Sequence, residues 1–193
     1  MDIITLRFDE LLELIPKFKN SSKESITATA MSIAGAFKSG RKILICVNGG
    51  SAADSQHFAA EFVNIFSKKI NRRALPAMAL STDTSVITAI ANDSSFDQVF
   101  ARQIEAYAEP GDIVIAFTTS GSSQNCINAV VSARAKGAKT IAFTCINAEI
   151  SKFVEISVEV PSTDTQHIQE CHILAYHIIA ELVEKQLFVR KQT

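Results

Sequence analysis

The chain has 193 residues, of which 47% are hydrophobic and 20% charged, and its formal net charge is -1 at pH 7. This length and composition suit one folded domain with a sizeable core and exclude a disordered chain. A charge so close to zero gives no general attraction for nucleic acid or for an anionic membrane surface, so we expect neither as a partner.

The N-terminal stretch bears on where the protein is found. "MDIITLRFDELLELIPKF" has acids among its apolar residues and lacks the basic start and uninterrupted apolar core of a signal peptide. No apolar run in the chain approaches the roughly 20 residues that a membrane span needs. We therefore expect a cytoplasmic protein.

The hydrophobic pattern predicts helices that alternate with short buried strands. Residues 3–18 and 22–38 have helical periodicity, so two helices should precede the first strand, with Ser21 and Ser22 opening the second helix. Continuous apolar runs predict strands at 42–47, 76–80, 112–117, 139–144 and 153–160. Helical stretches lie between these strands at 52–66, 84–91, 96–108 and 124–136, and a long amphipathic stretch follows at 166–188.

This alternation indicates the fold class. Strands that are apolar along their whole length are covered on both faces, and helices between them lead to a parallel sheet. The sequence contains no internal repeat and no Pro/Gly/Ser-rich linker. We therefore predict a three-layer α/β/α fold in a single domain, residues 1–193.

Two loops after predicted strands have the chemistry of anion-binding sites. They are "VNGGSAAD" at 47–54 and "TTSGSSQN" at 118–125. Each precedes a helix, whose free N–H groups attract anions, and glycines permit close backbone approach while hydroxyls donate hydrogen bonds. The loops predict a phosphate site, although Ser and Thr also act simply as helix caps. The residues concerned are Gly49, Gly50, Ser51, Thr119, Ser120, Gly121, Ser122 and Ser123.

All four histidines lie in two segments. "HFAAE" places His57 and Glu61 at i, i+4 on one helix face, a spacing that suits two metal ligands or a base and its orienting partner. "HIQECHILAYH" supplies His167, His172 and His177, together with Gln169. Because the sequence alone does not bring the two segments together, a purely structural role for each histidine stays open.

The motifs described above resemble, in order and spacing, those of one known family. "NGGSAADSQHFAAE", "LPAMALSTDTSVITAIAND", "TTSGSSQN" and "IQECHILAYH" are similar to stretches of the SIS (sugar isomerase) domain proteins, and within them of the phosphoheptose isomerases. The resemblance implies a five-stranded parallel sheet of flavodoxin-like order and the isomerisation of D-sedoheptulose 7-phosphate to D-glycero-D-manno-heptose 7-phosphate. It also implies a homotetramer that uses residues 1–40 in oligomerisation, with active sites assembled between subunits.

The resemblance assigns roles to particular residues. Glu61 and His177 would perform acid/base work, although both would also ligate the metal, and a ligating group is not a free base at the same instant. Zinc would be held by His57, Glu61, Gln169 and His177. The sugar phosphate would be bound by Asn48, Gly49, Gly50, Ser51, Thr118, Thr119, Ser120, Ser123 and Gln169, with Asp93 close to the substrate.

The chain departs from the family pattern at two arginines, which are Ile65 and His167 here. We hypothesise that "KKINRR" at 68–73 substitutes for them, with Arg72 and Arg73 in contact with the substrate. His172 has two alternative roles, either supporting the site or forming helix surface.

Two other functions remain alternatives: a non-catalytic SIS protein that binds a replication-initiator partner, and a phosphosugar-sensing module. The binding proteins typically lack the glutamate of "HFAAE" and the final histidine of "IQECHILAYH". Because the chain has both Glu61 and His177, the sequence favours the isomerase.

Overall fold

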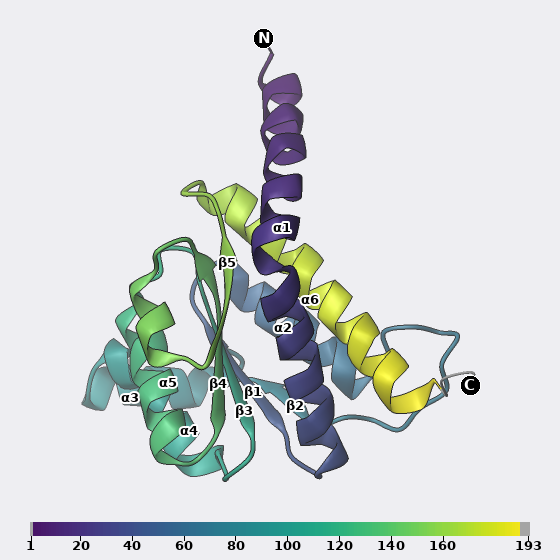
Figure 1. Cartoon of the computed structure of the whole chain (residues 1–193). Helices are drawn as coiled ribbons and strands as arrows, with labels where there is room; N and C mark the ends of the chain where they lie inside the picture. Colours follow the sequence, from purple (N-terminus) through teal and green to yellow (C-terminus); the bar gives the residue numbers. More distant parts are fainter. Residues whose placement is uncertain (1, 190–193) are drawn as a thin grey trace.

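The structure is a computed structural model that describes residues 2–189, and its strands and helices alternate along the chain (Figure 1). The strands are β1 (Ile43–Val47), β2 (Ala77–Ala79), β3 (Ile113–Thr118), β4 (Lys139–Cys145) and β5 (Ile156–Val160). The helices are α1 (Ile3–Lys38), α2 (Ser51–Val63), α3 (Thr84–Asp93), α4 (Ala101–Tyr107), α5 (Gln124–Ala135) and α6 (Thr165–Phe188), with 3-10 turns η1 (Phe96–Gln98) and η2 (Glu149–Phe153). The predicted helix at 96–108 is thus divided between η1 and α4, and the predicted strand at 153–160 begins only at Ile156.

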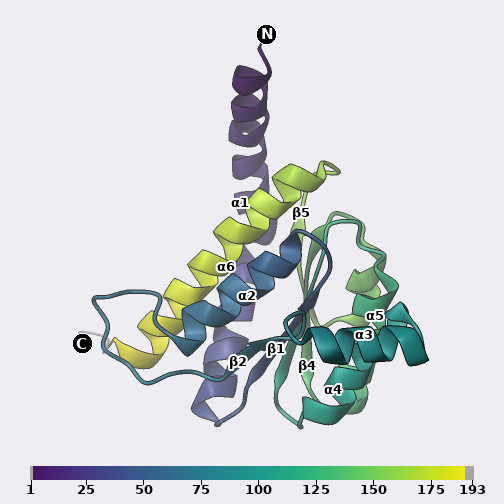
Figure 2. The ribbon, with the colours of Figure 1, turned by 180° about the vertical axis from the view of Figure 1, so that it is seen from behind.

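The five strands form one parallel sheet in the order β2-β1-β3-β4-β5, which confirms the expected flavodoxin-like order. Helices α1, α2 and α6 cover one face and α3, α4 and α5 the other (Figures 1 and 2). Alternate residues of β1 enter the two cores: Ile43 and Ile45 pack on the α1 side, and Leu44 on the α5 side. Successive side chains of a strand point to opposite faces, so continuous apolar runs were the correct signal for this sheet.

The prediction of two N-terminal helices is wrong, because α1 is one continuous helix of 36 residues. Ser22 does not cap a helix. Its hydroxyl is buried and donates to the Glu159 carbonyl of β5, at 2.7 Å, so the chain has no reason to break there. Buried positions recur every three or four residues through this point, which makes one uninterrupted face. They include Leu14, Phe18, Ser22, Ile26, Ala30, Ile33 and Phe37.

The sheet order fixes where a ligand would bind. Strands β1 and β3 are neighbours, with Val47 paired to Phe117, but their connections run to opposite faces: α2 follows β1 and α5 follows β3. Ligands of open parallel sheets bind at such a reversal, beyond the carboxyl ends of the strands. The two loops singled out above therefore meet at this edge. None of the described helices is long and apolar enough to cross a membrane.

Candidate active site

A reciprocal amide pair joins the two glycine-containing loops. Asn48 Nδ2 donates to Asn125 Oδ1 at 2.8 Å, and Asn125 Nδ2 donates back to Asn48 Oδ1 at 2.7 Å. Asn48 follows β1 and the buried Asn125 lies in the first turn of α5. Asn48, predicted to contact substrate, thus ties the two loops together. Asn125 was missed because its partner is distant in sequence.

The Ser/Thr loop after β3 is organised around the Thr118 hydroxyl. Thr118 Oγ1 lies 2.9 Å from Ser123 Oγ and 3.3 Å from Ser120 Oγ, and it accepts from the Gly121 amide at 3.1 Å. Gly121 has φ 72°, and a Cβ atom there would overlap Ala148. The glycine is required by both the turn and the close approach of the β4 loop. Thr119 and Ser120 lie at the loop surface, where their hydroxyls can meet an anion.

The first loop meets α6 through one side chain. Gly49 takes φ 61°, and the α2 helix begins at the buried Ser51. Gln169 Nε2 of α6 donates to Ser51 Oγ at 3.0 Å, and it lies close to Gly50. Gln169 is two turns, or about 12 Å, before His177 along α6. Gln169, which was expected to ligate the metal, therefore contacts the first loop instead.

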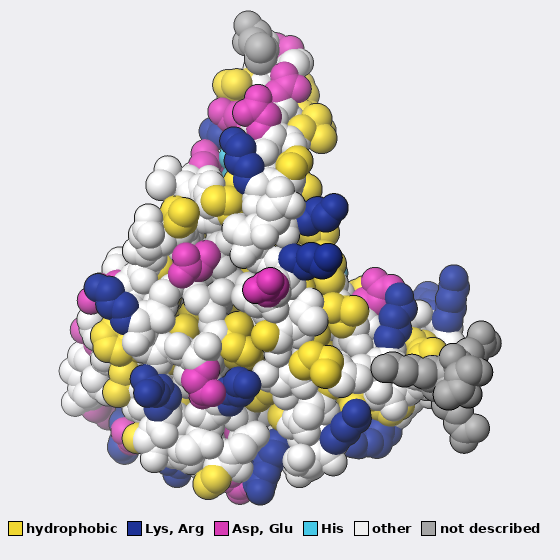
Figure 3. Space-filling view, viewed as in Figure 1, with side chains coloured by type: hydrophobic (Ala, Val, Ile, Leu, Met, Phe, Trp, Pro, Cys, Tyr) yellow, Lys and Arg dark blue, Asp and Glu magenta, His cyan; other side chains and the backbone are white. Residues whose placement is uncertain are grey.

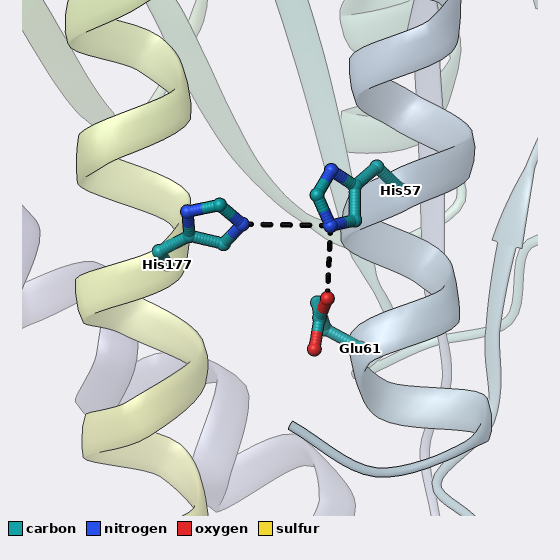
Figure 4. A group of neighbouring side chains, drawn as sticks. All are labelled: His57, Glu61 and His177. Atoms are coloured by element: carbon teal, nitrogen blue, oxygen red, sulfur yellow. Dashed lines mark hydrogen bonds and ion pairs between the residues drawn. The ribbon is translucent and has the colours of Figure 1, made fainter. Parts of the chain in front are cut away.

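Three predicted site residues come together between α2 and α6 (Figure 4). His57 Nε2 lies 2.9 Å from Glu61 Oε1 and 3.5 Å from His177 Nε2. One ligand-type atom from each residue lies within 4.8 Å of the other two. The spacing on α2 makes His57 and Glu61 neighbours, and packing of α6 beside α2 brings in His177. Along α2, His57 is about 9 Å beyond the N-terminus at Ser51.

Two imidazoles and a carboxylate suit a divalent metal, since this set leaves a coordination position open for water or substrate. Burial and the neighbouring His57 lower the pKa of His177 below its ordinary value, with Glu61 opposing this shift. A neutral His177 offers a lone pair, either to a metal or to a proton. The donor set and its spacing therefore fit a metal ion.

Tyr176 is a site residue that the sequence did not reveal. Its hydroxyl lies 3.0 Å from His57 Nδ1, the ring nitrogen opposite the one that meets Glu61 and His177. Burial raises the pKa of this phenol, as do the charges of Asp54 and Glu61, so the hydroxyl stays protonated. The one available signal was its place beside His177 on the last helix.

The hypothesis that Arg72 contacts substrate is wrong. Its side chain is 0% exposed, and Arg72 Nε donates to Glu184 Oε1 of α6 at 2.6 Å. Its other nitrogens donate to the carbonyls of Glu61 and Phe62, at 2.6 and 2.8 Å, and so cap the end of α2. Arg73 is exposed, and its contact is with the Phe37 carbonyl at 3.5 Å.

Of the two alternatives for His172, the structure rules out helix surface. It is 0% exposed, so it is not helix surface, and its ring lies edge-on to Phe117 and Phe143 beneath the Ser/Thr loop. Neither ring nitrogen has a hydrogen-bond partner in the described structure. Burial lowers the pKa of His172 to about 4. The Thr144 backbone lies near enough to oppose this shift, but not in the geometry of a hydrogen bond.

His167 and Asp93 lie away from the three converging side chains. His167 Nδ1 is 2.7 Å from Glu170 Oε2 and its Nε2 is 3.2 Å from Glu10 Oε2, so it links α6 to α1. The Glu170 hydrogen bond raises the pKa of His167 above its ordinary value. Asp93 ends α3, is exposed, and accepts from Asn92 Nδ2 at 2.7 Å. Ile65 is half-buried just after α2.

Fold and site together define an α/β domain with hydroxyl-rich loops at a sheet edge and a His/Glu/His group beside them. Residues 8–145 match the family model of the SIS domain. Two phosphoheptose isomerases are similar over most of their length. That of Citrifermentans bemidjiense is 47% identical, with 92% of each chain covered, and that of Geobacter metallireducens is 51% identical, with 84% of this chain and 86% of the other covered.

Solved structures agree with this likeness. A phosphoheptose isomerase from Francisella tularensis superposes with a TM-score of 0.90 at 32% identity, covering 94% of this chain and 96% of that one. One from Neisseria gonorrhoeae gives 0.88 at 35% identity, covering 94% and 97%. The chain belongs to the SIS-domain family and, within it, to the phosphoheptose isomerases.

Proposed function

We propose that the protein is an aldose-ketose isomerase that converts D-sedoheptulose 7-phosphate to D-glycero-D-manno-heptose 7-phosphate. This is the first step of ADP/GDP-heptose biosynthesis, which leads to lipopolysaccharide core, and we place it in the cytoplasm. The observation that supports the proposal best is the meeting of Glu61 and His177 on facing helices, beside loops suited to phosphate. Partner-binding or sensing SIS proteins would need no such meeting.

The reaction moves a carbonyl group between neighbouring carbons. A proton must therefore leave the carbon next to the carbonyl, and a proton must be delivered to the carbon that carried the carbonyl. Glu61 is the proposed base, because a carboxylate in a partly buried site can take and return that proton. Its Oε1 meets His57, while Oε2 makes no hydrogen bond with the described part of the chain. Oε2 can thus take up the substrate proton while Oε1 remains in contact with His57. His177 is proposed to move a proton between the two substrate oxygens.

The Ser/Thr loop is proposed to hold the substrate phosphate. Thr118, Thr119, Ser120 and Ser123 would supply donors from one loop, and the Ser51 end of α2 from the other, without any cationic side chain. The phosphate is at the far end of the sugar from the reacting carbons, and His57 lies about 9 Å along α2 from Ser51. Remote binding of this kind orients the reacting carbons.

We further propose that His57, Glu61 and His177 hold one zinc ion, with Gln169 joining them if its side chain leaves Ser51. Two histidines and a glutamate are a known donor set for catalytic zinc. When bound, the ion would polarise the substrate carbonyl and stabilise developing negative charge on oxygen.

A homotetramer is proposed, with α1 as its main contact. The first turns of α1 project beyond the body of the protein (Figures 1 and 3). Ile4, Phe8 and Leu12 form an i, i+4 row there and are 65–68% exposed. Large apolar side chains in a continuous row are typical of a surface that another chain covers. A second copy would bury this row.

The decisive experiment is an isomerase assay on purified protein with sedoheptulose 7-phosphate. We expect turnover in the wild type and a loss of about 10² to 10⁴-fold in Glu61→Gln, because this removes a positioned proton-transfer group. Glu105→Gln is the matched control, since Glu105 lies on α4 across the sheet and pairs with Arg102 at the surface. A wild type without turnover, or an unimpaired Glu61→Gln variant, contradicts the proposal. Metal analysis of protein never exposed to chelator tests zinc.

A further inference from the structure

The hydroxyl of Tyr176 connects α6 to the imidazole of His57. Tyr176 is 0% exposed, and its oxygen lies 3.0 Å from His57 Nδ1. The other ring nitrogen, Nε2, faces Glu61 and His177. Both nitrogens of His57 are thus engaged, and α6 supplies one partner at each side of the ring.

The position of the hydroxyl is set by the packing of the tyrosine ring. The ring stacks on Phe58 with centroids 5.2 Å apart and an interplanar angle of 26°. It meets the His57 and His177 rings edge-on, at 5.5 and 4.7 Å. A tyrosine side chain has two torsions, and here both are held by neighbours in the core. The hydroxyl is therefore a rigid reference point for a histidine whose side chain is 49% exposed.

A hydroxyl is suited to this place because it both donates and accepts hydrogen bonds. When Nε2 carries the imidazole proton and donates to Glu61, Nδ1 is an acceptor and the phenol donates to it. When Nε2 must present its lone pair to a metal, the imidazole proton resides on Nδ1, and Nδ1–H donates a hydrogen bond to the phenol oxygen. A carbonyl or carboxylate could serve only the second arrangement. Tyrosine keeps the ring oriented in both.

We propose that Tyr176 is a positioning residue that orients the His57 imidazole and keeps Nε2 directed toward Glu61 and His177. The value of this orientation for metal binding rests on the proposed function, whereas the hydrogen bond between Tyr176 and His57 is observed in the structure. The groups that hold a metal-ligating histidine by its second nitrogen typically contribute 10- to 100-fold to metal affinity. The contribution of Tyr176 should therefore be measurable as metal binding, apart from turnover.

The test compares Tyr176→Phe with Tyr107→Phe. The chain has two tyrosines, and Tyr107 lies on α4 at the other face of the sheet, 42% exposed, so both variants lose one hydroxyl. Zinc affinity is measured by competition with a chromophoric chelator. We expect about 10- to 100-fold weaker binding in Tyr176→Phe and wild-type binding in Tyr107→Phe. If the wild type binds zinc, equal affinity in the two variants would overturn the proposal.

A second measurement separates this inference from the metal proposal. In metal-free protein, the ¹⁵N chemical shifts of His57 report which nitrogen carries the proton and what bonds to it. We expect the Nδ1 resonance to move in Tyr176→Phe and to stay in Tyr107→Phe. An unmoved resonance would overturn the role of Tyr176. A wild type that binds no zinc but shows the Nδ1 change would reject the metal site and leave the positioning role supported.

Discussion

Arg72 and Glu184 form a buried ion pair, with Nε and Oε1 2.6 Å apart and side chains 0% and 1% exposed. Glu184 also accepts from the amides of Phe66 and Ser67, at 3.0 and 3.1 Å. Glu184 is two turns beyond His177 on α6, and Arg72 donates to the carbonyl of Glu61 at 2.6 Å. The pair therefore joins the same two helices that supply the converging site residues.

Glu184→Gln should strongly destabilise the protein, because it leaves the Arg72 charge buried without an opposite charge. We expect a loss of about 3–5 kcal/mol in the free energy of unfolding, measured by urea titration. Glu181→Gln is the control on the same helix. Its carboxylate is 50% exposed and pairs with Lys185, so its loss should cost less than about 1 kcal/mol. Similar losses in the free energy of unfolding for the two variants would show that the buried pair contributes no more than a surface pair.

Gly121→Ala should destabilise the Ser/Thr loop. Its φ of 72° costs an alanine about 1–2 kcal/mol, and overlap with Ala148 adds to this. Gly35→Ala is the opposite case, since it lies inside α1 with open space around it and should gain about 0.5–1 kcal/mol. Urea midpoints of the two variants should move in opposite directions, and a stabilised Gly121→Ala would contradict the loop geometry.

His172 should make stability fall in acid. Its pKa is 6.5 in the unfolded chain and about 4 in the fold, so the unfolded state binds more protons between these values. The contribution of the neutral, buried His172 to the free energy of unfolding is complete above pH 6.5. It is lost as pH falls toward 4, by up to roughly 3 kcal/mol. His172→Phe should therefore lose less stability than wild type between pH 7 and 4, as measured by urea unfolding.

His167 provides a control of opposite sign for this pH dependence. Its pKa is raised in the fold, so its contribution is complete below pH 6.5 and is lost as pH rises through the folded-state value. The difference in the free energy of unfolding between wild type and His167→Gln should accordingly grow as pH falls. Parallel pH profiles for wild type and His172→Phe would contradict a neutral, buried His172.

The exposed row on α1 should determine the oligomeric state. Phe8→Glu combined with Leu12→Glu should split the proposed tetramer, because it would place charges in an apolar contact. Val131→Glu, on α5 and 47% exposed before substitution, is the control and should keep the wild-type mass. Native mass spectrometry distinguishes the species. A tetrameric double variant, or a monomeric wild type, would contradict the assignment of α1.

Local pattern predicted the features that depend on neighbouring residues in the chain. Continuous apolar runs identified the strands, and the i, i+4 spacing placed His57 and Glu61 on one face of α2. It failed at Ser22, where a residue typical of a helix cap instead bonds to Glu159 of β5, 137 positions away. A local signal cannot register a partner that only the folded sheet provides.

The sequence by itself determined the α/β alternation, the two hydroxyl-rich loops and the identity of the reactive side chains, because these follow from periodicity and residue chemistry within a few turns. Only the tertiary structure decided that His177 meets His57 across 120 residues, that Tyr176 holds the second nitrogen of His57, and that Arg72 faces Glu184 instead of a substrate. Those contacts depend on how α2 and α6 pack on the sheet, and packing is set by the complementary shapes of side chains that lie far apart in the chain.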